Sequence, residues 1–414
     1  MLQTDLQTDQ AAPTSLLRHR SFVLFWCVRT FSTGANQMLA VAVGWQLYDL
    51  TNDPFDLGIV GLVQFVPLLA FSLVTGQVAD RYDRRFVIFT TQSVKALSTL
   101  GLCLATLLGF LSRELIFTLL CIIGIARAFE MPTLHALVPT IVPRSILPRA
   151  IAASASAQQT ATISGPAIGG FIYAFGAVTV YATCAAIFVA AAIVVVLVHT
   201  LYAKQDKTPV TLDSLLAGFR YIWSRQVLLG VVSLDMMAVT LAGVTALLPV
   251  FARDVLETGP WGLGLLRSAP GVGALITSVV LANMTIKHRA GYYLFASVAA
   301  YGLCIVIFGL STSFILSLAV LAAYGVVDAI SVVIRHSLVI TYTPTEMLGR
   351  VSSANSLFTG TTGMLGDFRA GAMAAWLGAV PAVLIGGVGA VLVTLLWMRL
   401  FPDIPRIDKL TRDS

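Results

Sequence analysis

Long apolar runs with few charges are the feature that most constrains this chain. They recur from Phe22 to Leu400, and each is about as long as the roughly 20 residues that an α-helix needs to cross a bilayer. With 57% hydrophobic residues and a mean hydropathy of +0.87, the 414-residue chain is too apolar for a water-soluble domain. The runs predict about twelve membrane-spanning helices, at about 22–47, 57–77, 86–110, 115–134, 150–173, 178–201, 227–250, 263–284, 291–311, 313–336, 352–376 and 379–400.

The distribution of charge predicts the orientation. Most of the 26 Lys and Arg residues fall in loops on one side, whereas the loop after the first span carries Asp49, Asp53 and Asp56 and no basic residue. The positive-inside rule therefore places both termini in the cytoplasm. The first span lacks a cleavage site and is expected to stay in the protein. Because the basic residues lie beside apolar spans, they indicate orientation in the membrane and no binding of nucleic acid.

The sequence contains no pattern typical of an enzyme, a metal site or a cofactor site. No nucleophile, base and orienting group come together, and no nucleotide-binding loop appears. Five cysteines lie within apolar runs and form no CxxC pair, so neither a disulfide framework nor a zinc site is predicted. They are Cys27, Cys103, Cys121, Cys184 and Cys304.

An internal repeat divides the chain into two similar halves. Many positions of residues 1–201 recur in residues 227–414: Gly58, Gly124, His135, Gly165 and Gly170 return as Gly264, Gly325, His336, Gly366 and Gly371. A parallel repeat of two six-helix bundles is expected. Residues 202–226 connect the halves, and apolar residues at helical spacing there predict an amphipathic helix on the inner membrane face that tethers them. The alternative is a cytoplasmic extension of the seventh span.

The densest cluster of charge lies between the second and third spans. It reads from Gly76 to Arg85 and contains Asp80, Arg81 and Arg84. This cluster resembles the G-x-x-x-D-R-x-x-R-R loop of the major facilitator superfamily, which implies a gating motif at a cytoplasmic junction. Gly76 is expected to permit close backbone approach. Asp80 is expected to face the start of the eleventh span, near Ser352 and Ser353, where a helix dipole stabilises a carboxylate.

A second cluster, in the fifth span, resembles the G-P-x-x-G-G motif of proton-coupled exporters in the same superfamily. Its residues are Gly165, Pro166, Gly169 and Gly170. The proline removes a backbone hydrogen bond, and the glycines allow a neighbouring helix to approach closely. The alternative is a packing motif with no bearing on transport direction. Further stretches, including Thr343–Arg350, are similar to the enterobactin-exporter branch, which expels siderophores; they leave the substrate undetermined.

Charged and polar residues inside the spans are the candidates for function, because they are costly in a membrane. The proton-coupling candidates are Asp235, Glu130, Asp367 and Asp328. Asp235 has no partner in its own helix and is the first choice. Glu130 is the second, and Arg127, three residues away, is expected to neutralise it. Candidates for substrate contact or a charge network are Arg29, Asn36, Gln37, Gln64, Arg127, Arg267, Asn355 and Arg369.

Each of these residues also has a structural interpretation. Lys95 and Arg335 are expected to extend their charged ends toward the membrane surface. Asp367 and Arg369 form an inert buried pair in that interpretation. Arg29 contacts a substrate anion or pairs with Asp235 across the halves, and the second option would make Asp235 structural.

Together these observations predict an all-α membrane protein with the major facilitator fold. The expected function is proton-coupled export, by antiport, of a small amphiphilic molecule, siderophore-like or drug-like, across the bacterial inner membrane. Its partners would be lipids, protons and the substrate, and it is expected to be a monomer. The alternatives are a metabolite importer of the same fold and a sensor or lipid-handling protein that does not transport.

Overall fold

The computed structural model describes residues 15–200, 212–283 and 288–408, and the regular elements in those ranges are all helical. Nine helical segments there are long and apolar enough to cross a membrane. Three further helices, α1, α5 and α13, have a similar length but a more polar composition. With them the number of long helical segments in those ranges equals the twelve predicted spans. The helices are α1 Arg20–Thr51, α2 Pro54–Arg81, α3 Arg84–Leu107, α4 Arg113–Ile141, α5 Leu147–Ile172, α6 Ala177–Val196, α7 Leu212–Ser224, α8 Gln226–Leu241, α9 Leu248–Val250, α10 Pro260–Asn283, α11 Ala290–Leu310, α12 Phe314–Thr341, α13 Thr345–Leu377 and α14 Ala379–Leu400.

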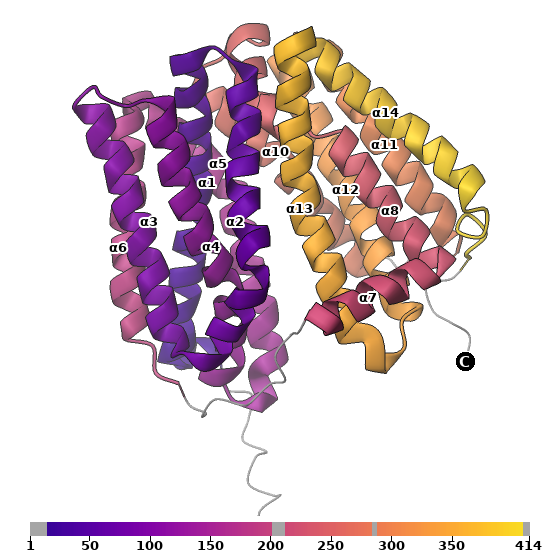
Figure 1. The fold of residues 1–414 in the computed structure, drawn as a ribbon, viewed down its shortest axis with the longest axis horizontal. Helices are drawn as coiled ribbons and strands as arrows, with labels where there is room; N and C mark the ends of the chain where they lie inside the picture. Colours follow the sequence, from indigo (N-terminus) through magenta and orange to yellow (C-terminus); the bar gives the residue numbers. More distant parts are fainter. Residues whose placement is uncertain (1–14, 201–211, 284–287, 409–414) are drawn as a thin grey trace, which may run out of the picture.

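The helices form two bundles, α1 to α6 and α8 to α14, that stand side by side (Figure 1). The sequence repeat is also a repeat of packing. Gly124 of α4 packs against Gln64 and Pro67 of α2, and its counterpart Gly325 of α12 packs against Pro270 of α10. In each bundle a glycine lets its helix lie directly on a neighbour, as expected for membrane helices.

Two glycine pairs join the bundles, and the repeat relates one pair to the other. A Cβ added to Gly371 of α13 would lie 2.6 Å from the Cα of Gly58 on α2. One added to Gly170 of α5 would lie 3.0 Å from the Cα of Gly264 on α10. Only glycine fits at such distances, so the close approach predicted for the fifth span is confirmed at Gly170. All four glycines lie toward the end of the molecule remote from α7.

Polar contacts reinforce the junction at that same end. Arg253 lies 3.4 Å from a carboxylate oxygen of Asp49 and donates a hydrogen bond of 3.3 Å to the carbonyl of Tyr48. The Tyr48 hydroxyl donates to the carboxylate of Asp254. We call Tyr48, Asp49, Arg253 and Asp254 the junction cluster. It ties α1 to the short π-helical turn Phe251–Val255 of the other bundle.

The bundles are apart at the end where α7 lies. Figure 1 shows them diverging in that direction. Within the described residues, open space surrounds the Cβ positions of Gly76 on α2 and of Gly360 on α13. The close backbone approach expected at Gly76 is therefore not made by any described residue in this conformation. The side chain of Asp80 lies outside the part that the structure describes, so its expected contact near Ser352 stays a prediction.

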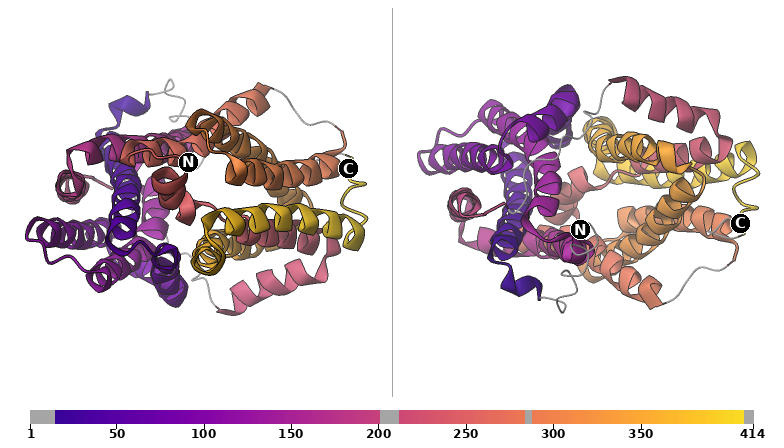
Figure 2. Two further views of the ribbon diagram at one scale, coloured as in Figure 1. Left: turned by 90° about the horizontal axis from the view of Figure 1, so that it is seen from above. Right: turned by 90° about the horizontal axis from the view of Figure 1, so that it is seen from below.

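The connection between the bundles contains the predicted amphipathic helix. α7 ends at Ser224 and α8 begins at Gln226, with the extended residue Arg225 between them. The break excludes a continuous extension of the seventh span. Ile222 is buried against Leu228 and Val351 of the second bundle, whereas Trp223 is exposed. α7 lies against the end of that bundle where the two bundles diverge (Figure 1), along one side of it (Figure 2).

The loop between α2 and α3 is held by its own charged residues. Asp83 caps α3 by accepting from the backbone N–H of Arg85 at 2.9 Å, and the Arg85 side chain pairs with it at 2.9 Å. The hydrogen bond from Arg85 lowers the pKa of Asp83 below its ordinary value. Arg84 is buried and donates to the carbonyl of Ala79 at 3.3 Å, whereas Arg81 is exposed.

Candidate functional site

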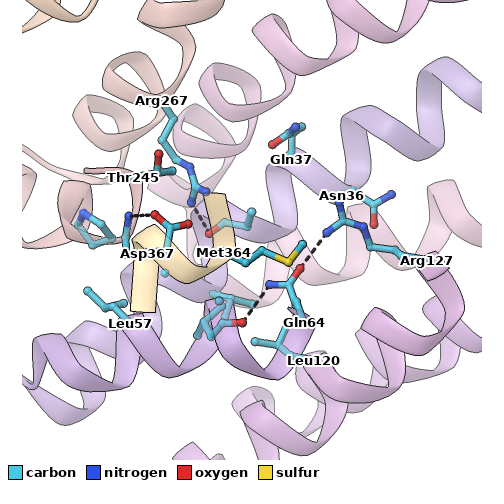
Figure 3. Close-up of a pocket in the computed structure, with 17 residues that line it drawn as sticks. Asn36, Gln37, Leu57, Gln64, Leu120, Arg127, Thr245, Arg267, Met364 and Asp367 are labelled. Carbon is cyan, nitrogen blue, oxygen red and sulfur yellow. Dashed lines mark hydrogen bonds between the residues drawn. The ribbon is translucent and has the colours of Figure 1, made fainter. Parts of the chain in front are cut away.

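A cavity of about 220 Å³ lies between the two bundles. Helices α1, α2 and α4 supply one wall, and α10, α13 and the chain after α8 supply the other (Figure 3). Six residues singled out from the sequence line it: Asn36, Gln37, Gln64, Arg127, Arg267 and Asp367. Because both halves contribute charged side chains, a bound molecule would contact both halves at once.

Both arginines of the cavity are held by hydrogen bonds. Arg127 of α4 donates to the amide oxygen of Gln64 on α2 at 2.8 Å. Arg267 of α10 donates to the carbonyl of Ala40 on α1 at 2.9 Å, so this bond joins the bundles. Each guanidinium has further donors beyond these bonds. The cavity can therefore offer positive charge and fixed donors to an anionic or hydrogen-bond-accepting group.

The carboxylate of the cavity is held by a break in the seventh span. The sequence predicted one continuous helix here, but α8 ends at Leu241, and a 3₁₀ turn, Thr245–Leu247, leads into α9. A broken helix exposes backbone N–H groups that need partners. The N–H of Ala246 donates to Asp367 of α13 at 3.1 Å, and Arg267 attracts the same carboxylate across the cavity. Asp367 thus faces Arg267, and the expected pair with Arg369 is not formed.

A second polar cluster is enclosed in the first bundle. Glu130 of α4 pairs with Lys95 of α3 at 2.6 Å, and Lys95 is fully buried. Lys95 also donates to the hydroxyl of Ser32 on α1 at 2.8 Å, and Gln92 donates to Glu130 at 2.7 Å. Glu130 thus forms its ion pair with Lys95 and not with Arg127, which was the expected partner. The expectation that Lys95 extends toward the membrane surface is wrong. Helix α3 points Lys95 inward, where a carboxylate and a hydroxyl satisfy it.

Two other predicted pairings differ from the structure. Arg29 of α1 donates to the side chain of Gln158 on α5 and does not meet Asp235. Asp235 of α8 pairs with Arg335 of α12, whose side chain is 3% exposed. Asp235 therefore has a partner, and that partner lies not in its own helix but in another helix of the same bundle. Its role as a proton carrier stays a prediction.

The remaining candidates lie in the second bundle, away from the cavity. Arg369 donates to the sulfur of Met373 at 2.9 Å, and two of its buried nitrogens have no hydrogen-bond partner among the described residues. Asp328 of α12 lies near Tyr301 and Tyr324, whose rings are tilted at 42° to each other with centroids 4.8 Å apart. Within the described residues Asp328 forms no ion pair. Asn355 of α13 is buried.

Sequence reasoning missed several residues that the fold places at these sites. Ser32, Gln92 and Gln158 complete the polar contacts of the first bundle, and Ala246 binds the cavity carboxylate through its backbone. Polar residues within α1 and α3 were visible in the sequence as breaks in hydropathy. No signal marked Ala246, because a backbone N–H is present at every residue except proline.

The comparison with known families gives the identity of this architecture. Residues 11–414 match the family described as transmembrane secretion effector. This chain belongs to that family. It is a member of the major facilitator superfamily and a membrane transporter, with lipids around it and a small molecule as its substrate.

Relatives of known name cover nearly the whole transporter. It is 28% identical over 398 residues to the enterobactin exporter EntS of Citrobacter koseri, covering 95% of this chain and 94% of the relative. It is 29% identical over 384 residues to EntS of Shigella dysenteriae serotype 1, covering 91% and 88%. The predicted resemblance to the enterobactin-exporter branch is confirmed.

Solved transporters share the fold. A bacterial homologue of the human lysosomal transporter Spinster, inward-facing and unoccupied, superposes with a TM-score of 0.73 at 12% identity, covering 95% of this chain and 99% of the other. A bacterial homologue of the iron transporter ferroportin, inward-facing, gives 0.70 at 16% identity, covering 95% and 100%. At such low identity the match establishes the fold alone.

Proposed function

We propose that this transporter is a proton-coupled exporter that moves a small amphiphilic molecule, siderophore-like or drug-like, out across the bacterial inner membrane by alternating access. The observation that supports this most is one cavity, lined by charged residues of both bundles, beside a junction closed at one end only. The positive-inside distribution of Lys and Arg supports placing the closed end outward. The conformation would then be the one that loads substrate from the cytoplasm, and the relatives named as enterobactin exporters support this direction.

Within this proposal, Asp367 is the proton carrier. Asp235 and Glu130 are each engaged in an ion pair, and protonating either would leave a buried cation without its partner. Asp367 lines the cavity and is held by one backbone hydrogen bond and the attraction of Arg267. A proton on Asp367 would weaken that attraction between α10 and α13. Substrate binding and proton binding would thereby act on the same cross-bundle contact.

Efflux measurements in cells test the proposal. Cells with and without the transporter are loaded with a catecholate, a macrolide or a dye cation, and its retention is followed with and without a proton uncoupler. We expect lower retention of one class when the transporter is present, and loss of the difference with the uncoupler. Efflux that is unchanged by the uncoupler would contradict proton coupling. Accumulation of the substrate inside the cells would indicate the importer. No change for any probe would favour the sensor or lipid-handling alternative.

Two carboxylate variants test whether proton coupling depends on the cavity or on another carboxylate of the second bundle. Asp367→Asn mimics the protonated form and should abolish uncoupler-sensitive efflux at normal expression. Asp328→Asn is the matched control, since Asp328 lies in the same bundle but does not line the cavity. It should leave coupling intact. Loss of coupling in Asp235→Asn, with Asp367→Asn active, would return the role to Asp235.

A further inference from the structure

An apolar crevice lies on the first bundle, separate from the cavity between the bundles. It has a volume of about 360 Å³ and is lined by residues of α2, α3 and α4. Helix α4 packs against both α2 and α3, which hardly touch each other, so α4 forms the floor of a gap between them. The lining threonines, Thr90 and Thr91, donate their hydroxyls to carbonyls of their own helix. Their polar atoms are therefore satisfied without any ligand.

The crevice lies where it would meet the hydrocarbon of one leaflet. On α3 it runs from Phe86 to Val94, a length of about 12 Å at about 1.5 Å per residue. One leaflet is roughly 15 Å of a hydrocarbon core that is about 30 Å thick. The rim residues Tyr82 and Phe86 and, farther along α3, Leu97 are exposed, so the gap opens sideways. Water in such a gap would be unfavourable, whereas a lipid chain gains apolar contact.

An exposed cation is next in the chain to a residue at the rim of the crevice. Arg81 is the last residue of α2, directly before the rim residue Tyr82, and it is exposed. Arg84 is bound to the carbonyl of Ala79, and Arg85 is paired with Asp83. Arg81 forms no ion pair with another described side chain. Of the three arginines in this loop, it is the one positioned to meet an anionic group at the membrane surface.

We propose that this crevice binds one acyl chain of a phospholipid from the leaflet at the α7 end, and that the Arg81 side chain binds the phosphate of the same lipid. Such a lipid would be retained when the surrounding bilayer is removed. It would contact α2 and α3 beside the charged loop that joins them. This site is independent of the cavity that faces both bundles.

Native mass spectrometry of the full chain in detergent, with added phosphatidylglycerol, tests the site. The wild type should retain one lipid. Thr90→Trp, which places an indole at the exposed edge of the crevice, should lower the lipid-bound fraction by at least about fivefold. Arg81→Gln should weaken retention by about fivefold, the effect of one basic residue near an anionic lipid surface. Arg149→Gln, an exposed arginine at the start of α5, is the matched control and should change nothing.

Fluorescence quenching locates the bound chain. None of the six native tryptophans lines the crevice, so Ile125→Trp provides a reporter on its floor. Phosphatidylglycerol with brominated chains should quench it and saturate at one lipid per protein, whereas glycerol 1-phosphate should not displace the lipid. Quenching without saturation, or retention in Thr90→Trp equal to the wild type, would overturn the proposal.

Discussion

At the scale of single residues, burial in the membrane makes ion pairing decisive. Lys95 and Glu130 each lie among apolar side chains, and Lys95 also stands 4.6 Å from the centre of the Phe188 ring. A charge in such a place is tolerated because a partner and hydrogen bonds satisfy it. The pair therefore belongs to the packing of the first bundle.

The first prediction concerns this pair. Glu130→Gln would leave the Lys95 ammonium buried without a counter-charge, and we expect a loss of about 3 to 5 kcal/mol of stability, the usual effect of removing one partner of a buried pair. Thermal unfolding of the purified protein in detergent measures it. Glu114→Gln, which removes the carboxylate of the exposed Arg113 pair, is the control and should leave the midpoint unchanged. The double variant Lys95→Met, Glu130→Gln should recover most of the loss, and an unstable double variant would contradict the explanation.

At the scale of helices, glycines decide where the bundles can touch. Gly58, Gly170, Gly264 and Gly371 bring α2 against α13 and α5 against α10. Two equivalent contacts on either side of the cavity hold the closed end. A side chain at any of these positions would push α13, which carries Asp367, away from α2, or α10, which carries Arg267, away from α5.

The second prediction follows from that contact. In Gly170→Ala the new Cβ would lie 2.5 Å from the carbonyl oxygen of Pro260. Overpacking of this kind costs about 1 to 3 kcal/mol. Because the cost falls on the closed junction, we expect a shift of about 5- to 150-fold toward conformations open at that end. The measurement is the labelling rate of a cysteine at Val43, which lines the cavity, by an impermeant thiol reagent from that side. Gly360→Ala, where an added Cβ meets nothing, should label like the wild type.

At the scale of the whole molecule, the closed end has polar contacts between the bundles, whereas no described residue of the other bundle packs against Gly76 of α2 or Gly360 of α13. The junction cluster contributes the polar contacts. Arg253 is its centre, since it contacts Asp49, the Tyr48 carbonyl and the Tyr48 ring. Opening the closed end would require all three contacts to break together.

The third prediction tests this cluster. Arg253→Gln should lower the ratio of closed to open molecules at that end by about 1.4- to 5-fold, because partly exposed ion pairs contribute about 0.2 to 1 kcal/mol. Spin labels at Asn52 and Glu257, exposed residues of opposite bundles, report the separation by pulsed electron resonance. Arg113→Gln, at the same end but within one bundle, should leave the distances unchanged. An unchanged distribution in Arg253→Gln would show that the glycine contacts hold the end alone.

The sequence by itself determined the class, the twelve spans and the repeat, because apolar length and glycine spacing are local properties of a membrane helix. It also indicated most of the cavity, since Arg127, Arg267 and Asp367 are costly in a membrane wherever they lie. Only the tertiary structure decided the pairing of charges. Lys95 meets Glu130, and Asp367 meets a backbone N–H, because partners of buried charges come from other helices. Which helices touch depends on how the two bundles pack, and no single span records it.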